Sequence, residues 1–279
     1  MKNALTFDIE DWYQSTYNKN AQVRSIVIEQ TLKVLDILNN AGVRATFFVQ
    51  GFIAEAFPQI VKEIHKLGHE IGTHGYAHEF IFNQTRSAYA DDLDKSIKLL
   101  EDLIGEKIIG YRAPDFSITE SSLWALDVLE QAGILYDSSI FPIKNKRYGI
   151  PNFKRHFHYL NKPQRLIEFP LSTVRIFGKN LPISGGGYFR LLPYSIIRSA
   201  LKRINTEGMS AMVYMHPYEF DPYDISSIPR INENLSDSLF RFMQNMNRKK
   251  SEMKLRKLLK DFTFYPVKEV LNLDSGSIF

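Results

Sequence analysis

The chain has 279 residues, of which 44% are hydrophobic and 24% charged, and it contains no cysteine. This composition is that of a globular protein, and it excludes disulfide scaffolds, thiolate metal sites and cysteine nucleophiles. Any metal must therefore be held by histidine and carboxylate side chains. The length allows either one large α/β domain or two smaller ones.

The net charge of +4 is unevenly distributed along the chain. Residues 241–260 contain eight Lys or Arg and a single Glu, so the rest of the chain is slightly acidic. Such a segment can contact an anionic membrane, or it can be the solvated face of a terminal helix. We favour the solvated helix, because apolar residues recur at helical spacing just before it. No nucleic-acid-binding motif accompanies the charge, so we expect no nucleic-acid partner.

Short β-like runs alternate with longer helical patterns from the first residues onward. Helices are predicted at residues 23–39, 58–67, 86–103, 119–132 and 194–207, and glycine follows several of them as a stop signal. Strands are predicted at Ala4–Phe7, Ala45–Val49, His69–Thr73, Ile108–Tyr111, Leu135–Tyr136, Arg165–Phe169 and Ser210–Met215.

This alternation predicts a mostly parallel sheet with helices outside, and seven strands suggest a barrel or a distorted barrel. We expect a single α/β domain over residues 1–230, with a looser insertion at about 141–193. Residues 231–279 are expected to form a basic helix and a tail that pack on the barrel. The amino terminus lacks a secretory apolar run and no stretch is long enough to span a membrane, so we expect a cytoplasmic protein.

Polar residues with catalytic potential fall at the carboxyl ends of the predicted strands. In parallel α/β barrels this rim carries the active site, because its loops vary while the scaffold stays fixed. The strand-end residues are Asp8, Glu10, Asp11, His74, His78, Arg112, Asp137 and His216.

His74 and His78 are four residues apart, so in a tight turn both imidazoles can face one divalent cation. Taken alone, such a pair is more often structural than metal-binding. Because side chains alternate along an extended chain, Asp8 and Glu10 can share one side while Asp11 points away. Glu10 is then the favoured third ligand and Asp8 is free to act as a base. Asp11 is the alternative to Glu10 as the metal-binding carboxylate.

Arg112 and His216 each have a functional and a structural interpretation. The Arg112 guanidinium can orient a carboxylate, or it can form an ordinary ion pair. His216 can act as a general acid, or it can be a buried, hydrogen-bonded histidine.

The sequence resembles the polysaccharide deacetylases, the NodB-homology family of carbohydrate esterases (family 4). The motifs FDIED, THGYAH, YRAP, YDSS and YMHP occur in the family's order. The longer runs FDIEDWYQ, RYGIP, GGGYFRLLPY and HPYEFDP resemble a subgroup associated with bacterial exopolysaccharide and capsule export systems.

The resemblance implies a distorted (β/α)7 barrel with one divalent metal, zinc or cobalt. It implies that Asp8 is the catalytic base, that His74 and His78 are metal ligands, and that Arg112 tethers the base. It further implies that His216 is the catalytic acid, tuned by Asp137. The family pattern has two adjacent Asp, whereas Ile9 follows Asp8 here, so Glu10 or Asp11 must supply the metal-binding carboxylate.

The resulting expectation is a metal-dependent hydrolase that removes N-acetyl groups from amino sugars of a bacterial polysaccharide or its precursor, releasing acetate. The alternatives are a deformylase or amidohydrolase acting on a lipid-linked sugar or small cyclic amide, and a catalytically inactive glycan-binding relative. Residues expected to contact the sugar are Asp11, Trp12, Tyr13, Tyr76, Pro114, Phe116, Tyr188 and Tyr218.

Overall fold

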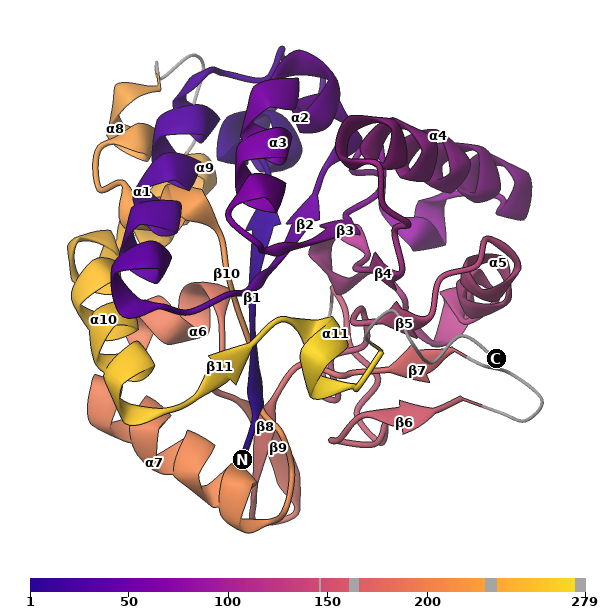
Figure 1. Ribbon diagram of the computed structural model, residues 1–279. Helices are drawn as coiled ribbons and strands as arrows, with labels where there is room; N and C mark the ends of the chain where they lie inside the picture. Colours follow the sequence, from indigo (N-terminus) through magenta and orange to yellow (C-terminus); the bar gives the residue numbers. More distant parts are fainter. Residues whose placement is uncertain (146, 161–165, 229–234, 274–279) are drawn as a thin grey trace.

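The computed structural model describes residues 1–145, 147–160, 166–228 and 235–273. Seven strands lie side by side and parallel in a curled sheet (Figure 1). In sheet order they are β10 (Met212–Met215), β1 (Asn3–Ile9), β2 (Thr46–Val49), β3 (Glu70–Thr73), β4 (Gly110–Tyr111), β5 (Tyr136–Asp137) and β7 (Ile167–Glu168).

All seven predicted strands are confirmed, although Arg165, the first residue of the sixth prediction, lies outside the described residues. Two further described strands of this sheet were not predicted: β6 (His158–Tyr159) extends the sheet antiparallel to β7, and β11 (Phe264–Tyr265) pairs with the start of β1. β1 and β2 are buried along their whole length, as expected for parallel strands covered on both faces.

The barrel is distorted between β7 and β10, where the described strands do not pair with each other. Irregular chain fills this gap. The Met212 backbone N–H donates to the Ser172 hydroxyl at 2.7 Å, and the Tyr214 N–H donates to the Ser184 carbonyl at 3.0 Å. The molecule is therefore a distorted α/β barrel in a single domain, as predicted.

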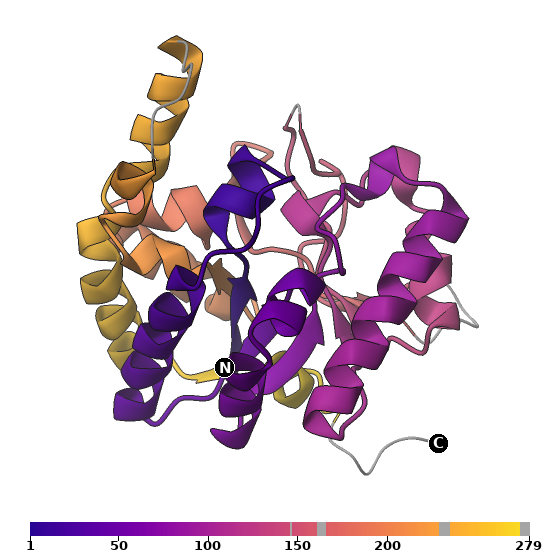
Figure 2. The same cartoon turned by 90° about the horizontal axis from the view of Figure 1, so that it is seen from above.

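Helices surround the sheet (Figure 2): α1 (Ile26–Ala41), α2 (Gly51–Ala56), α3 (Pro58–Lys66), α4 (Arg86–Ile104), α5 (Ala125–Gln131) and α7 (Tyr194–Thr206). Gly42 ends α1 with a φ of 63°, which explains why glycine stands there. The helix predicted at 119–132 is instead divided into η4 (Glu120–Ser122) and α5, and α2 was not predicted. The remaining short turns are η1 (Tyr13–Tyr17), η2 (Ile81–Asn83), η3 (Pro114–Phe116) and η5 (Pro217–Phe220).

The loose stretch at 141–193 has more regular structure than predicted. Besides β6 and β7, it holds the antiparallel pair β8 (Thr173–Ile176) and β9 (Lys179–Pro182), followed by α6 (Gly186–Leu191). Gly185 allows the chain to pass over Tyr214, since a Cβ atom at Gly185 would lie 2.1 Å from the tyrosine ring.

The carboxyl-terminal part forms α8 (Asp224–Ser227), α9 (Leu235–Asn245), η6 (Arg248–Lys250), α10 (Ser251–Asp261) and α11 (Val267–Val270). None of the described helices combines the length and hydropathy needed to cross a membrane.

The interpretation of the basic segment as a solvated face is partly wrong. Arg241, Arg248 and Lys254 are buried and donate to backbone carbonyls. The Lys254 ammonium, for example, donates to the carbonyls of Phe189, Arg190 and Leu192, which satisfies the free carbonyl groups at the end of α6. These cations hold the terminal helices against the barrel.

Gly110 on β4 gives a test of this packing. A Cβ atom there would lie 2.1 Å from the Tyr136 hydroxyl, which itself donates to buried Glu70. We expect Gly110→Ala to lower the free energy of unfolding by about 1–3 kcal/mol, measured by urea denaturation. Gly187→Ala serves as the control, because its nearest contact would be 3.7 Å away. If the two variants had the same midpoint of urea denaturation, this account would be contradicted.

Candidate active site

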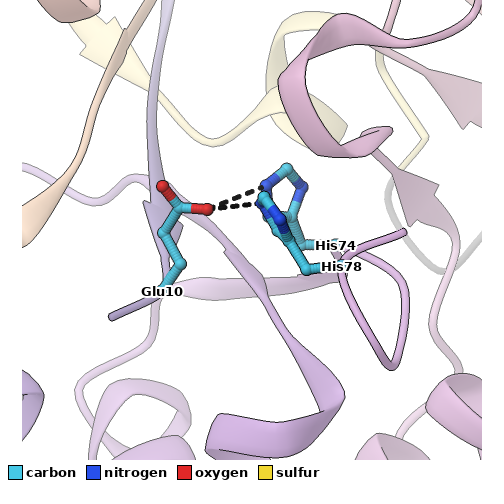
Figure 3. A group of neighbouring side chains, drawn as sticks. All are labelled: Glu10, His74 and His78. Atoms are coloured by element: carbon cyan, nitrogen blue, oxygen red, sulfur yellow. Dashed lines mark ion pairs between the residues drawn. The ribbon is translucent and has the colours of Figure 1, made fainter. Parts of the chain in front are cut away.

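Glu10, His74 and His78 meet at the carboxyl ends of β1 and β3 (Figure 3). One ligand atom from each lies within 4.8 Å of the other two, and all three side chains are buried. Glu10 Oε2 is 2.5 Å from His78 Nε2 and 3.8 Å from His74 Nε2. The cluster thus contains the two histidines and the carboxylate that the sequence analysis favoured.

The local backbone explains this convergence. His74 continues β3, and its N–H donates to the Val49 carbonyl at 3.0 Å. The chain then turns through residues with positive φ, Gly75 at 72° and His78 at 60°. His78 is held in this uncommon conformation because Asp92 on α4 accepts the N–H groups of the two residues between, at 2.7 and 2.9 Å.

The cluster fits a divalent cation. His74 Nδ1 lies 2.8 Å from the Arg112 carbonyl, so it donates there and leaves Nε2 free as a ligand. His78 Nε2 faces the Glu10 carboxylate, and His78 Nδ1 is buried without a hydrogen-bond partner among the described residues. Two imidazoles and one carboxylate, with no thiolate, form a ligand set suited to zinc or another first-row divalent metal.

In the cluster, burial and the neighbouring charges act in opposite directions on the pKa values of Glu10 and His78. Burial would raise the pKa of Glu10, but His78, together with His216 and His74, holds that pKa well below its usual range. Burial would lower the pKa of His78, whereas the adjacent Glu10 raises it. The two side chains thus favour each other's charged form, and a metal bound there would take the place of a proton on His78.

Asp8 lies beside the cluster without belonging to it. Its Oδ1 accepts a hydrogen bond from Arg112 Nη1 at 2.7 Å, while its Oδ2 lies 3.8 Å from His216 Nε2. Arg112 is fully buried and also donates to Thr6 and to both oxygens of Ser138, at 2.7 to 3.1 Å. This network fixes the Asp8 carboxylate so that one oxygen is held and the other faces the pocket.

His216 faces the cluster from the end of β10, with Nε2 3.6 Å from Glu10 Oε1. Its Nδ1 lies 3.4 Å from Glu219 Oε2, and its ring stacks on Tyr218. Burial would lower the pKa of His216, but the Glu219 hydrogen bond and the charges of Glu10, Glu219 and Asp8 raise it to about 9. His216 therefore carries a proton at neutral pH.

The sequence analysis missed Glu219 and its partner Arg190. Arg190 Nε donates to Glu219 Oε1 at 2.7 Å, and Nη1 donates to the Gln244 carbonyl near the end of α9. Burial would raise the pKa of Glu219, whereas His216 and Arg190 lower it to about 2. A usable signal existed, since Glu219 stands three residues after His216 and closes a capping box with it.

The cluster opens into a pocket of about 340 Å³. Asp8, Glu10, His74, His78 and His216 share its wall with four predicted sugar-contacting aromatics, Trp12, Phe116, Tyr188 and Tyr218. Residues of the pocket that the sequence analysis did not single out include Asp115, Arg147, Tyr148, Arg190, Tyr214, Glu219, Met243 and Gln244. Asp115 and Arg147 form an ion pair there.

Four residues expected to contact the sugar lie outside this wall, one of which is Tyr13, whose ring stacks on Tyr17. Asp11 is enclosed and accepts hydrogen bonds from Arg24, so it stabilises the loop after β1 instead of facing the pocket. Tyr76 directs its hydroxyl to Glu55 at 2.7 Å. Pro114 is buried at the start of η3, next to the Gly75 turn.

Asp137 also differs from its expected role, because the carboxylate beside His216 is Glu219. Asp137 accepts a hydrogen bond from the Ser139 hydroxyl and interacts with Glu168, and all three are fully buried. Burial raises the pKa of both acids, and for Glu168 the nearby Asp137 raises it further. The two acids lie opposite each other on β5 and β7, so they belong to the packing of these strands.

Two family models divide the chain almost equally. The model described as polysaccharide deacetylase matches residues 3–136, and a domain family of unknown function, DUF3473, matches residues 138–272. The first supplies Asp8, Glu10, His74, His78 and Arg112, and the second supplies His216.

Curated relatives match less than half of the chain. The peptidoglycan deacetylase-like protein FGM2 of Gibberella zeae is 35% identical over 45% of this chain and 36% of its own length. A peptidoglycan-N-acetylglucosamine deacetylase of Bacillus cereus is 33% identical over 40% of this chain and 45% of its own length. The matches thus span under half the length of these relatives.

Solved structures share the fold over almost the whole chain. A crystal structure from Mycobacterium smegmatis, provisionally named a polysaccharide deacetylase, has a TM-score of 0.65 at 20% identity and covers 98% of this chain and 89% of its own. A pseudoenzyme of carbohydrate esterase family 4 from Bacillus anthracis has a TM-score of 0.52 at 14% identity, covering 97% of this chain and 65% of its own. These likenesses concern the fold.

Metal binding can be measured without any substrate. We expect the purified protein, stripped with chelator and titrated with Zn²⁺, to take up one equivalent, and His78→Ala to bind at least about a hundredfold more weakly. His156→Ala, at an exposed histidine, should bind like the unchanged protein. Unaltered affinity in His78→Ala would show that the cluster is not the metal site.

Proposed function

This chain belongs to the polysaccharide deacetylase family through residues 3–136, and from that premise we propose that it is a metal-dependent hydrolase of N-acetylated amino sugars. It would remove the acetyl group from a bacterial polysaccharide or its precursor and release acetate and a free amine. The observation that carries the proposal is the placement of Asp8 and His216 beside each other and next to a buried cluster of Glu10, His74 and His78.

Glu10, His74 and His78 would hold the metal, which we propose to be zinc, with cobalt as a possible replacement. Bound there, the cation would supply Lewis-acid polarisation of the amide carbonyl and would make a water molecule more acidic. The three side chains are buried and their orientations are fixed by the β1 and β3 ends, so the donor set is preorganised.

Asp8 would act as the general base. Arg112 holds Oδ1, which leaves Oδ2 to accept a proton from the attacking water. Because Arg112 is fixed by Thr6 and Ser138, the carboxylate cannot rotate freely. Arg112 is thus proposed as a positioning residue that acts through Asp8.

His216 would act as the general acid. Cleavage of the carbon–nitrogen bond leaves an amine that must receive a proton, and protonated His216 can donate it from Nε2. With a pKa raised to about 9, the imidazole is loaded with this proton at neutral pH. Glu219 holds the opposite ring nitrogen and so fixes which nitrogen faces the pocket.

The pocket supports a sugar substrate. Trp12, Phe116, Tyr148, Tyr188 and Tyr218 present aromatic surface around a space of about 340 Å³, and aromatic faces stack on pyranose rings. One curated relative named above is a peptidoglycan-N-acetylglucosamine deacetylase and the other is named peptidoglycan deacetylase-like, which supports an N-acetylated polymer as substrate. An exopolysaccharide is the polymer suggested by the longer sequence motifs.

The two alternative functions, hydrolysis of another amide and glycan binding without catalysis, require different features of this site. A formamide or cyclic amide would use the same base and acid, so acyl-group specificity separates it from acetamide hydrolysis. An inactive glycan-binding protein would not need Asp8, Arg112 and His216 in their present geometry. The intact set supports an enzyme.

Replacement of the base tests the proposal. With Zn²⁺ or Co²⁺ added, we expect acetate release from N-acetylglucosamine oligomers, and a fall of about 10²- to 10⁴-fold in kcat for Asp8→Asn. Asp94→Asn, at an exposed helix position paired with Lys98, is the matched control. Absence of acetate from a panel of amino sugars and metals, or full activity in Asp8→Asn, would contradict the proposal.

The pH profile tests the role of Glu219. The protonated form of His216 is the active acid, so kcat/KM should fall as the pH rises through its pKa. Glu219→Gln keeps a side chain of equal size but removes the charge that raises this pKa, so the alkaline limb should move to lower pH by about one unit. A purely structural role would lower activity equally at all pH values and leave the limb in place.

A further inference from the structure

The antiparallel pair β8 and β9 is a hairpin with one apolar and one polar face. Val174 pairs with Leu181 and Ile176 with Lys179, whereas Arg175 pairs with Asn180. Because side chains alternate along a strand and directly paired residues lie on the same face, Val174, Ile176 and Leu181 share one face with Lys179, and Arg175 and Asn180 share the other. The hairpin lies at the lower edge of the molecule in Figure 1.

The hairpin tip exposes an aromatic side chain in an unfavourable conformation. Phe177 is 100% exposed, and its φ of 47° lies in the left-handed region, as does that of Gly178 at 76°. Two-residue turns with positive φ at both positions normally carry Asn-Gly. A bulky residue there costs conformational energy. Neither folding stability nor solubility accounts for a phenylalanine at this position, which points to a contact outside the chain.

The apolar face of the hairpin extends the apolar surface that Phe177 exposes at the tip. Ile176 and Leu181 are 40% and 43% exposed, and with α7 they form an open groove of about 460 Å³. Other apolar residues of the groove are Val174, Ile183, Leu192, Ile196 and Ala200.

The polar face borders a cavity of about 750 Å³ that is rich in cations. Its wall includes Lys144, Lys154, Arg155, Arg175 and Lys179, and it contains no Asp or Glu. Within the described part of the chain, Arg155 is the member of this set that has an ion pair, with Glu207 at 3.0 Å. A cavity that is lined by several Lys and Arg side chains and by no Asp or Glu favours an anionic ligand.

Two buried polar atoms of the same wall also lack partners within the described ranges. These are Arg155 Nε, a donor, and Asn180 Oδ1, an acceptor. Buried polar groups are normally hydrogen-bonded, so the pair indicates that the wall is completed by another molecule.

We propose that the β8–β9 hairpin docks on a membrane surface that contains anionic lipid. Phe177 and the adjoining Ile176 and Leu181 would enter the boundary between headgroups and acyl chains. The cations of the neighbouring cavity would bind the lipid phosphates. The apolar groove and the cationic cavity both border the hairpin and share Leu181, so apolar and cationic surfaces adjoin at this edge, as docking on headgroups above acyl chains requires.

A membrane suits this surface better than a protein partner does. A stable protein interface needs about 800 Å² of complementary surface on each side. A narrow hairpin tip offers little such area, whereas insertion into a fluid layer requires no complementary shape. This contact also differs from the membrane contact considered for residues 241–260, because Arg241, Arg248 and Lys254 of that segment are buried within the protein.

Phe177→Asn is the decisive variant, because it separates binding from folding. Asn suits the turn better than Phe, so the variant should have an unchanged or higher Tm. In sedimentation with vesicles of phosphatidylglycerol and phosphatidylethanolamine at low salt, we expect the unchanged protein to bind and Phe177→Asn to bind about tenfold more weakly. Arg175→Glu combined with Lys179→Glu should abolish binding, and neutral phosphatidylcholine vesicles should bind neither protein.

Matched controls locate the contact. Phe242→Ser changes a similarly exposed phenylalanine on α9, and Lys257→Glu reverses a cation of α10; both should bind like the unchanged protein. Loss of binding in either control instead, or no binding of the unchanged protein, would overturn the proposal. So would sedimentation velocity showing a dimer that Phe177→Asn dissociates. The assay needs neither metal nor substrate, so its result is independent of the proposed deacetylase activity.

Discussion

The buried guanidinium of Arg112 is the interaction on which both barrel and site depend. Arg112 comes from the end of β4 and is removed from water, a large cost unless every donor finds an acceptor. The acceptors come from Thr6 and Asp8 on β1 and from Ser138 after β5, and the guanidinium lies over the Phe48 ring of β2. The strands must therefore stay in register for the charge to be satisfied, and that register sets the position of Asp8.

The two halves of the chain contribute different parts of the same pocket. Residues before 137 provide Asp8 and the Glu10, His74 and His78 cluster. Later residues provide His216 and the supports around it, with Arg190 linking Glu219 to the carbonyl groups near the end of α9. The carboxyl-terminal half is thus part of the site and is not an accessory domain. A truncation near residue 137 would leave the proposed base without its acid.

Much of the fold and part of the site could be predicted from the sequence because their signals are local. Short apolar runs between helices with glycine stops indicated all seven parallel strands, and alternation along β1 placed Glu10 with Asp8 and Asp11 away from both. Contacts between distant segments had no such signal. Asp137 stands at a strand end like the other candidates, but only the three-dimensional arrangement shows its carboxylate beside Glu168.

Charge counted along the sequence is a weaker guide than charge counted around a surface. The densest run of Lys and Arg, at 241–260, suggested an outward-facing cationic segment, yet a helix buries one side, and Arg248 and Lys254 fall on the buried side. The cations around the 750 Å³ cavity come instead from two separate stretches, 144–155 and 175–179, of which the first has five Lys or Arg and no acid. Folding brings the two stretches together without acids, so the full set of cations that would face an anionic partner is visible only around the cavity and not in either stretch alone.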